Sequence, residues 1–327
     1  MPILLICLLS LSVFAIPERD YKLVWNRDVL ASLDSIPNGE FSNNQGKKVR
    51  YRTYFRGPGL PYIVVSPGRT EPMKKYFELV HDLPNANFYL IDHQGQGESE
   101  RLLESRDKGY VRRFENYVSD FTHFMESIVL PETKGQKLYL IAHSMGGAIA
   151  TRYMEMHPEA FQRVAFSAPM YDIFTKPYPK PVAQSIAALL VAAGQGTKYA
   201  PGRKAYNPAE DTLERSEFSH SLARIEMNKF LFVEQDLVVG GPTVRWVFEA
   251  FRGLKNIHLV GKKLRMPILL LQATEDTTVK PEKQVEFCEL AHDCKLVKME
   301  GAFHEILQEK DSIRNHSLKL IRKHFNL

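Results

Sequence analysis

Three residue types that support nucleophilic catalysis follow one another along the chain, a serine, an aspartate and a histidine. Ser144 lies in the segment Leu138-Tyr-Leu-Ile-Ala-His-Ser-Met-Gly-Gly147, which has the pattern of a strand, a tight turn and a helix start. The segment approximates G-x-S-x-G, in which a sharp turn exposes the serine hydroxyl. Ala142 replaces the first glycine, Gly146 is the second, and His143 fills the variable position, so all three support the turn. The pattern favours a nucleophilic Ser144 over its alternative, a helix N-cap.

A nucleophilic serine needs a base and an acid that orients the base. Asp276 and His304 each follow an apolar run typical of a strand. Because the carboxyl ends of parallel strands meet at one edge of a sheet, we expect Ser144, Asp276 and His304 to lie together there. Asp172 and Glu275 are the alternatives for the acid, and a surface loop position is the alternative for His304.

Acyl transfer also needs backbone N–H donors for the oxyanion of the tetrahedral intermediate. We expect one from Met145, directly after the serine, and a second from Arg69, which follows Gly68 in a Pro-Gly turn. The alternative for this loop is a plain turn. The Arg69 side chain is expected to form an ion pair with Glu71 or another acid, and contact with a phosphate is the alternative.

Other segments fail to match cofactor, metal or nucleic-acid sites. Asp92-His-Gln-Gly-Gln-Gly-Glu-Ser99 lacks the G-x-G-x-x-G spacing of dinucleotide loops, and His304-Glu305 has Gln308 where a zinc protease has a second histidine. Lys and Arg number 43 against 38 acids, a net charge of +5, without a basic stripe. We therefore expect no cofactor, no metal and no nucleic-acid partner.

The elements that must position these residues alternate between strand and helix patterns. Apolar, β-rich runs predict strands at Val49–Phe55, Tyr62–Ser66, Phe88–Asp92, Leu138–Ala142, Val164–Ala168, Ile268–Gln272 and Lys295–Met299. Helical periodicity predicts helices at Met73–Leu83, Arg113–Leu130, Gly146–His157, Pro281–His292 and Asp311–Phe325. This order predicts an α/β fold with a mostly parallel sheet and helices on both faces.

The alternation stops between about residues 171 and 261, where Val182–Ala193 and Trp246–Leu254 have helical patterns. We interpret residues 171–261 as an inserted helical cap, or lid, and residues 16–170 and 262–327 as the core. Within the lid, the apolar run Ile186–Ala193 has two interpretations: it lines a groove for one acyl chain, or it forms the core of the lid.

The matching motifs are Ser66-Pro-Gly-Arg-Thr-Glu71, Asp92-His-Gln-Gly-Gln-Gly97, Ala142-His-Ser-Met-Gly-Gly147, Ser167-Ala-Pro-Met170 and Gly301-Ala-Phe-His-Glu-Ile-Leu307. Through these motifs, the chain resembles the serine α/β-hydrolases. The resemblance extends from about residue 45 to the end of the chain. The branch is that of the monoacylglycerol lipases and the inner-membrane lysophospholipases of Gram-negative bacteria. Monoacylglycerol lipases usually have His-Gly where this chain has Pro67-Gly68, which favours the lysophospholipases.

The resemblance implies an α/β-hydrolase fold and a serine hydrolase without cofactor or metal, with Ser144, Asp276 and His304 as its catalytic residues. The implied substrate is a small monoacyl lipid, a lysophospholipid first and a monoacylglycerol second, with peripheral membrane contact. A monoacylglycerol lipase, a general carboxylesterase and a thioesterase are the alternative enzymes. An inactive binding protein of the same fold is the alternative of another class.

The N-terminal segment favours a signal peptide over residues 1–15. Ile3–Ile16 carries no charge and is shorter than the ~20 apolar residues that span a bilayer. Val13 and Ala15 are small residues at the −3 and −1 positions of a cleavage site, although Lys and Arg are missing before the run. We expect an exported or membrane-associated protein at the periplasmic or inner-membrane face, with a cytoplasmic location as the alternative.

Cysteine usage leaves two readings. If Cys7 leaves with the signal, Cys288 and Cys294 remain as an even pair. They form either a disulfide, as an oxidising compartment permits, or two ordinary thiols. Their spacing fits no standard zinc pattern.

Overall fold

A computed structural model describes residues 15–327 of the 327-residue chain. Apart from Ala15, the segment expected to be a signal peptide lies outside the described residues. Across residues 15–327, no helix combines the length and the apolar character needed to cross a membrane.

Eight strands form one sheet in the order β1-β2-β4-β3-β5-β6-β7-β8. The strands are β1 (Gly39–Ser42), β2 (Lys48–Tyr54), β3 (Tyr62–Ser66), β4 (Asn87–Asp92), β5 (Leu138–His143), β6 (Arg163–Ser167), β7 (Ile268–Ala273) and β8 (Cys294–Met299). β2 pairs antiparallel with both β1 and β4, and the remaining pairs, from β4 to β8, are parallel. The central strands are buried along almost their whole length, as their nearly continuous apolar sequence predicts.

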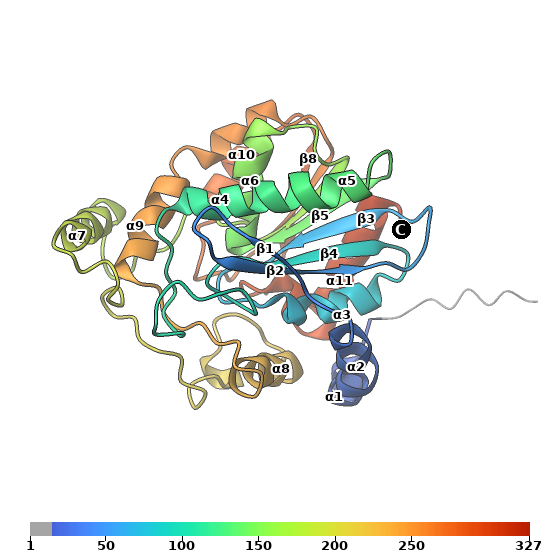
Figure 1. Ribbon diagram of the computed structural model, residues 1–327, viewed down its shortest axis with the longest axis horizontal. Coiled ribbons are helices and arrows are strands. Elements are labelled where there is room, and N and C mark those ends of the chain that lie inside the picture. Colours follow the sequence, from blue (N-terminus) through green and yellow to red (C-terminus); the bar gives the residue numbers. More distant parts are fainter. Residues whose placement is uncertain (1–14) are drawn as a thin grey trace, which may run out of the picture.

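Helices cover both faces of this sheet, which confirms the predicted fold class. The helices are α1 (Tyr21–Val24), α2 (Ala31–Asp34), α3 (Phe77–Asp82), α4 (Phe114–Phe124), α5 (Leu130–Glu132), α6 (Ser144–Met156), α7 (Lys180–Ala192), α8 (Leu222–Val233), α9 (Val244–Gly253), α10 (Glu282–Leu290) and α11 (Asp311–Phe325). Figure 1 shows α4, α6 and α10 on one face, and α3 and α11 on the other. Because β3, β5, β7 and β8 are parallel, the loops that follow them all lie at the carboxyl edge of the sheet.

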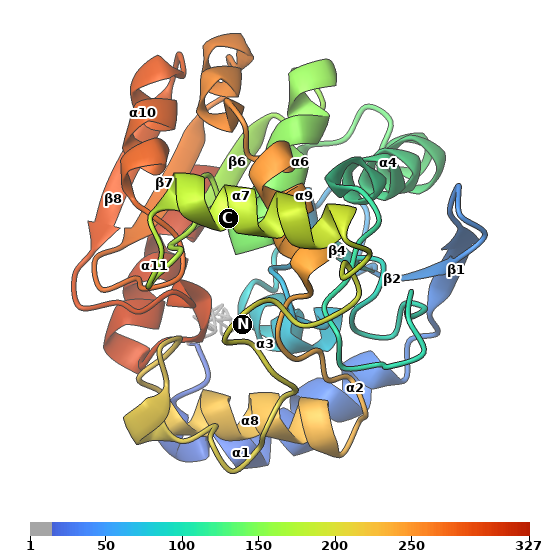
Figure 2. The same cartoon turned by 90° about the vertical axis from the view of Figure 1, so that its left-hand side faces the viewer.

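The segment between β6 and β7 contains α7, α8 and α9 and, among its described residues, no strand of the sheet. α7 packs on α9, whereas α8 lies apart from them beside α1 (Figure 2). Arg224 of α8 is fully buried and anchors the helix to the core: it donates to Glu78 at 2.8 Å, to Asp311 at 3.4 Å and to the carbonyl oxygen of Ile16 at 3.2 Å. The sequence pattern did not predict α8.

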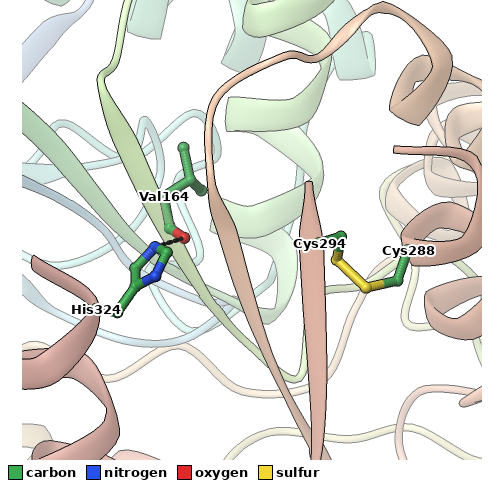
Figure 3. Close-up of a disulfide and its surroundings, with 4 residues drawn as sticks. All are labelled: Val164, Cys288, Cys294 and His324. Carbon is green, nitrogen blue, oxygen red and sulfur yellow. Dashed lines mark hydrogen bonds between the residues drawn. A yellow bond between two sulfur atoms is a disulfide. The ribbon is translucent and has the colours of Figure 1, made fainter. Parts of the chain in front are cut away.

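A disulfide joins Cys288 in α10 to Cys294 at the start of β8, with the two Cα atoms 5.2 Å apart (Figure 3). Of the two readings left open by the sequence, the structure has the bridge. Figure 3 also shows His324, in α11, hydrogen-bonded through Nε2 to the carbonyl oxygen of Val164 in β6 at 3.0 Å. Both links connect a helix to a strand of the sheet.

Candidate active site

The structure brings Ser144, Asp276 and His304 together at the carboxyl edge of the sheet. His304 Nδ1 lies 2.6 Å from Asp276 Oδ2, and His304 Nε2 lies 2.8 Å from Ser144 Oγ. Because a carboxylate only accepts, Nδ1 carries the ring proton and Nε2 accepts from the hydroxyl. This is the geometry in which a histidine can remove the serine proton.

The turn at Ser144 explains the small residues around it. Ser144 adopts a φ of 48°, a left-handed conformation that costs energy in a residue with a side chain. A Cβ added at Gly146 would fall 2.1 Å from the carbonyl oxygen of Ser66 and 2.4 Å from that of Pro67. Ala142 is fully buried within β5. The start of α6 therefore passes too close to β3 for a larger residue at position 146.

Asp276 is buried, and its second oxygen accepts from the backbone amides of Thr278 at 2.8 Å and Val279 at 3.0 Å. Burial alone would raise the pKa of Asp276, but the hydrogen bonds from His304 and from the two amides outweigh it and hold this pKa below its ordinary value. The carboxylate thus stays ionised beside the imidazole, which favours a positively charged ring during proton transfer.

The two alternative acids lie elsewhere. Asp172 accepts from Lys180 Nζ at 2.5 Å and from the amide of Ile173, and Glu275 is exposed. Neither is hydrogen-bonded to His304 among the described residues.

The loop after β3 lies against the serine turn, as expected for an oxyanion hole. A Cβ on Gly68 would fall 2.9 Å from the ring of His143, so the loop depends on glycine for its close approach. Within the described residues, the N–H groups of Met145 and Arg69 donate to no protein acceptor. An oxyanion hole requires two amides that are free to donate in this way, so both residues remain candidates for it.

The expected ion pair between Arg69 and Glu71 is wrong. Glu71 instead accepts from Lys75 Nζ at 2.8 Å, from Tyr76 at 2.6 Å and from the amide of Gly68 at 2.5 Å. Lys75 follows Glu71 by four residues and contacts its carboxylate, whereas Arg69 extends to the carbonyl oxygen of Gly240.

Sequence reasoning missed a buried charge cluster beneath the site, made of Glu71, Lys75, Tyr76 and Glu305. Lys75 Nζ also contacts Glu305 at 2.6 Å, directly after His304 in the chain. Burial opposes the charge on Glu71, yet Lys75 and its other donors lower the pKa of Glu71 to about 2. The spacing of Glu71 and Lys75 was a readable signal, but Glu305 lies 230 residues from Lys75 and gave none.

His143 supports the turn as a neutral residue. Its Nδ1 donates to the carbonyl oxygen of Ser167 at 2.9 Å, across to β6. Burial lowers the pKa of His143 to about 4. The ring lies 4.8 Å from that of His304, so a neutral His143 leaves the neighbouring imidazole free to accept a proton.

The segment between β6 and β7 contacts the site. Phe218 lies edge-on to the His304 ring at 6.5 Å, and its carbonyl oxygen accepts from the amide of Glu305. The α7 run from Ile186 is mostly exposed, with only Ala187 buried, so its interpretation as the core of a lid is wrong. A cavity of about 620 Å³ lies between α7 and α9. Ala188 is one of its lining residues, and Ser144 is not.

Residues 60–311 match the sequence family described as serine aminopeptidase, S33. The chain belongs to this family. This S33 family member is 35% identical to lysophospholipase L2 of Escherichia coli K12 over 277 residues, which cover 81% of the chain and 80% of that protein. It is 29% identical to a probable lysophospholipase L2 of Haemophilus influenzae over 306 residues, 92% of the chain and 95% of that protein.

Solved structures share the fold of the S33 family member. A soluble variant of monoglyceride lipase from Saccharomyces cerevisiae, in complex with a substrate analogue, superposes with a TM-score of 0.69 at 21% identity. The match covers 89% of this chain and 94% of that one. The resemblance to the α/β-hydrolases stated from the motifs is confirmed.

Proposed function

We propose that the protein hydrolyses the acyl ester of a lysophospholipid through an acyl-enzyme on Ser144. The observation that carries the reaction is the hydrogen-bonded chain from Ser144 through His304 to Asp276. The relatives called lysophospholipase L2 support the substrate, since they align over four fifths of their length. The chain is a carboxylic ester hydrolase on this view, and monoacylglycerols are the second candidate substrate because of the shared fold of monoglyceride lipase.

The site residues divide the chemistry between them. His304 Nε2 takes the proton of Ser144 as Oγ attacks the ester carbonyl, and the ionised Asp276 stabilises the resulting imidazolium. His304 then gives the proton to the leaving glycerol oxygen, and the acyl group stays on Ser144. Water attacks this ester, again with His304 as base, and releases the fatty acid.

The amides of Met145 and Arg69 are placed to receive the negative charge on the carbonyl oxygen. Each donor of this kind contributes ~3 kcal/mol to the transition state. The Glu71 carboxylate holds the Gly68 amide and with it the loop that presents Arg69. The buried cluster thus acts as a positioning element for the oxyanion hole.

A probe and a substrate panel test the proposal. A fluorophosphonate should label the wild type and the Ser127→Ala control, whose serine is exposed on another helix, but not Ser144→Ala. Equal labelling of the two variants would show that Ser144 is not the nucleophile. Hydrolysis of lysophosphatidylcholine and lysophosphatidylethanolamine should exceed that of short nitrophenyl esters. Turnover of the short esters alone would refute the lipid substrate.

We place the protein in an oxidising compartment outside the cytoplasm. The signal-like sequence of residues 1–15 and the Cys288–Cys294 disulfide support export. N-terminal sequencing of the protein from its native cells should give Ile16 as the first residue, and alkylation before reduction should leave both cysteines unmodified. A free Met1 together with two alkylated cysteines would refute export.

The inserted segment 171–261 is the proposed lid, and its α7 arm supports contact with a lipid surface. Residues 171–205 carry Asp172 as their only acid against the cations Lys176, Lys180, Lys198, Arg203 and Lys204. Tyr178, Val182 and Leu189 expose 46%, 45% and 71% of their surface beside these charges. Apolar side chains flanked by cations favour the interface of an anionic bilayer.

Vesicle sedimentation tests the lid contact. The protein should bind vesicles that contain phosphatidylglycerol more strongly than pure phosphatidylcholine vesicles. Leu189→Gln should weaken this binding, and Phe55→Gln, which changes another exposed apolar residue after β2, should not. Equal binding by both variants would refute α7 as the contact surface.

A further inference from the structure

The side chain of Arg69 carries a charge beside the active site that no acid balances. Its Nη1 donates to the carbonyl oxygen of Gly240 at 2.9 Å, and the guanidinium lies 5.4 Å from the ring centre of Trp246. Among the described residues, no carboxylate lies within ion-pair distance of it. Within residues 15–327, its Nε and Nη2 make no hydrogen bond and are not fully enclosed by protein atoms.

Three arginines that are more deeply buried than Arg69 each pair with an acid. Arg52, Arg224 and Arg314 expose 6%, 0% and 1% of their side chains, and each contacts at least one carboxylate. Such pairing is the rule, since a buried charge without a partner is costly. Arg69 is half-buried and, like the half-buried Arg56 and Arg101, donates to backbone carbonyl oxygen rather than to a carboxylate. It differs from those two in its place, the loop that abuts the serine turn.

The surroundings of Arg69 are positive rather than acidic. Arg203, which is exposed, lies beside the loop that accepts from Arg69: a Cβ on Gly241 would fall 3.0 Å from the Cβ of Arg203, and the preceding Gly240 accepts from Arg69 Nη1. Burial, and to a smaller extent the charge of Arg203, lowers the pKa of Arg69 to about 10. At neutral pH Arg69 therefore keeps its charge. Gly109 leaves room for the guanidinium, because a Cβ there would fall 3.0 Å from Nη1. Two neighbouring guanidinium groups without an acid favour an anion between them.

The position of Arg69 fits a particular anion. Its backbone N–H lies in the loop that abuts the serine turn, where the ester carbonyl reacts, whereas its side chain extends away from the turn to Gly240 and Trp246. An anion on the guanidinium would lie one arginine side chain away from the reacting carbonyl. In a lysophospholipid, the glycerol backbone separates the acyl ester from the phosphate by a comparable stretch of single bonds.

We propose that Arg69, assisted by Arg203, binds the phosphodiester of the lysophospholipid whose ester reacts at Ser144. A guanidinium presents parallel N–H donors that match two phosphate oxygens. A monoacylglycerol has no group for this site, so Arg69 selects the phosphorylated lipid. The inference rests on the proposed function, and it names the group that determines the head-group class.

The test measures a ratio, because the backbone of Arg69 also belongs to the oxyanion hole. kcat/KM is determined for lysophosphatidylcholine and for a monoacylglycerol with the same acyl chain. Arg69→Met should lower the ratio of the two constants about tenfold or more, Arg69→Lys less, and Arg203→Gln in the same direction. Arg265→Met, an exposed arginine just before β7 at the opposite edge of the sheet, should leave the ratio unchanged.

A soluble probe separates the head group from other effects. Glycerophosphocholine should compete with short-ester hydrolysis by the wild type, and Arg69→Met should weaken this inhibition. Inhibition by inorganic phosphate alone would indicate an adventitious anion site and overturn the assignment.

The two proposals fail in different ways. A wild type that cleaves lysophospholipids while neither Arg69→Met nor Arg203→Gln changes the ratio refutes the role of Arg69 and leaves the reaction standing. A wild type without lysophospholipid turnover refutes the substrate itself. Arg203 is exposed, so its variant tests the site even if Arg69→Met does not fold.

Discussion

Gly146 lies so close to the backbone of Ser66 that a Cβ built on it would fall 2.1 Å from the Ser66 carbonyl oxygen. The contact joins the helix that begins at Ser144 to the strand that leads into the loop of Gly68 and Arg69. The nucleophile and the expected oxyanion donors are thus fixed relative to each other through backbone rather than through mobile side chains.

Gly146→Ala should therefore lower activity strongly, although it adds only one methyl group. The added methyl group meets backbone, which cannot rotate away, so α6 or β3 must shift. We expect at least about a hundredfold loss of kcat, since misplacement of about 1 Å has that effect. Gly57→Ala is the matched control, because nothing lies within 4 Å of the added Cβ. Equal activity of the two variants in a steady-state ester assay would contradict the contact.

Asp276→Asn should lower kcat on the order of 10⁴-fold while the fold remains intact, because an amide at this position favours the wrong tautomer of His304. Asp172→Asn, which removes the competing acid, should leave kcat close to that of the wild type. Circular dichroism should confirm folding of both. A large loss for Asp172→Asn and none for Asp276→Asn would reassign the acid.

Glu71 gives the protein a specific response to acid. Its pKa in the folded protein is about 2, below the ordinary 4.5, so the ionised carboxylate stabilises the fold above about pH 4.5. That stabilisation is lost as the pH falls from about 4.5 to about 2. Glu71→Gln should lower the free energy of unfolding by about 3 kcal/mol at pH 7, and by much less at pH 3.

Urea unfolding at the two pH values measures this difference. Glu40→Gln is the control, since Glu40 pairs with Lys48 and Arg50 at the surface and should show no comparable pH-dependent change. A loss for Glu71→Gln that is the same at pH 7 and pH 3 would contradict the low pKa.

The Cys288–Cys294 bridge closes a short loop and should contribute about 2 kcal/mol by restricting the unfolded chain. The double variant Cys288→Ser/Cys294→Ser should lower Tm, and dithiothreitol should lower the Tm of the wild type by the same amount while leaving the double variant unaffected. An equal effect of the reductant on both proteins would show that the bridge is not its target.

The apolar runs in the sequence were enough to predict most strands of the sheet. Elements whose structure depends on contacts with distant residues could not be predicted from their own sequence. The seven predicted strands all occur. In β3 to β7, burial on both faces leaves a nearly uninterrupted apolar sequence, whereas the partly exposed β2 and β8 were recognisable by their β-rich composition. β1 escaped detection, since four half-exposed residues, Gly39–Ser42, give no such run. α8 has a mixed sequence, and its position depends on Arg224 meeting Glu78 across 146 residues.

The site followed the same division. Ser144 was readable from its motif, and Asp276 and His304 from their places after strands. The partner of Arg69 was not readable, because a nearby Glu71 suggested an ion pair that Lys75 in fact makes. Arg69 and Lys75 are both close to Glu71 in the sequence. The direction of the chain after Gly68 decides which of them reaches the Glu71 carboxylate, and this direction is known only from the fold.

The position of the disulfide at the end of the strand order has a consequence for self-association. β8 is an edge strand, and such a strand exposes unpaired N–H and C=O groups that can recruit another chain. Here the disulfide links the first residue of β8, Cys294, to α10, and Lys295 and Lys298 are exposed along the strand. The disulfide and the repulsion between lysines on two such strands both disfavour edge-to-edge polymerisation. Neither feature involves the residues at the catalytic edge of the sheet.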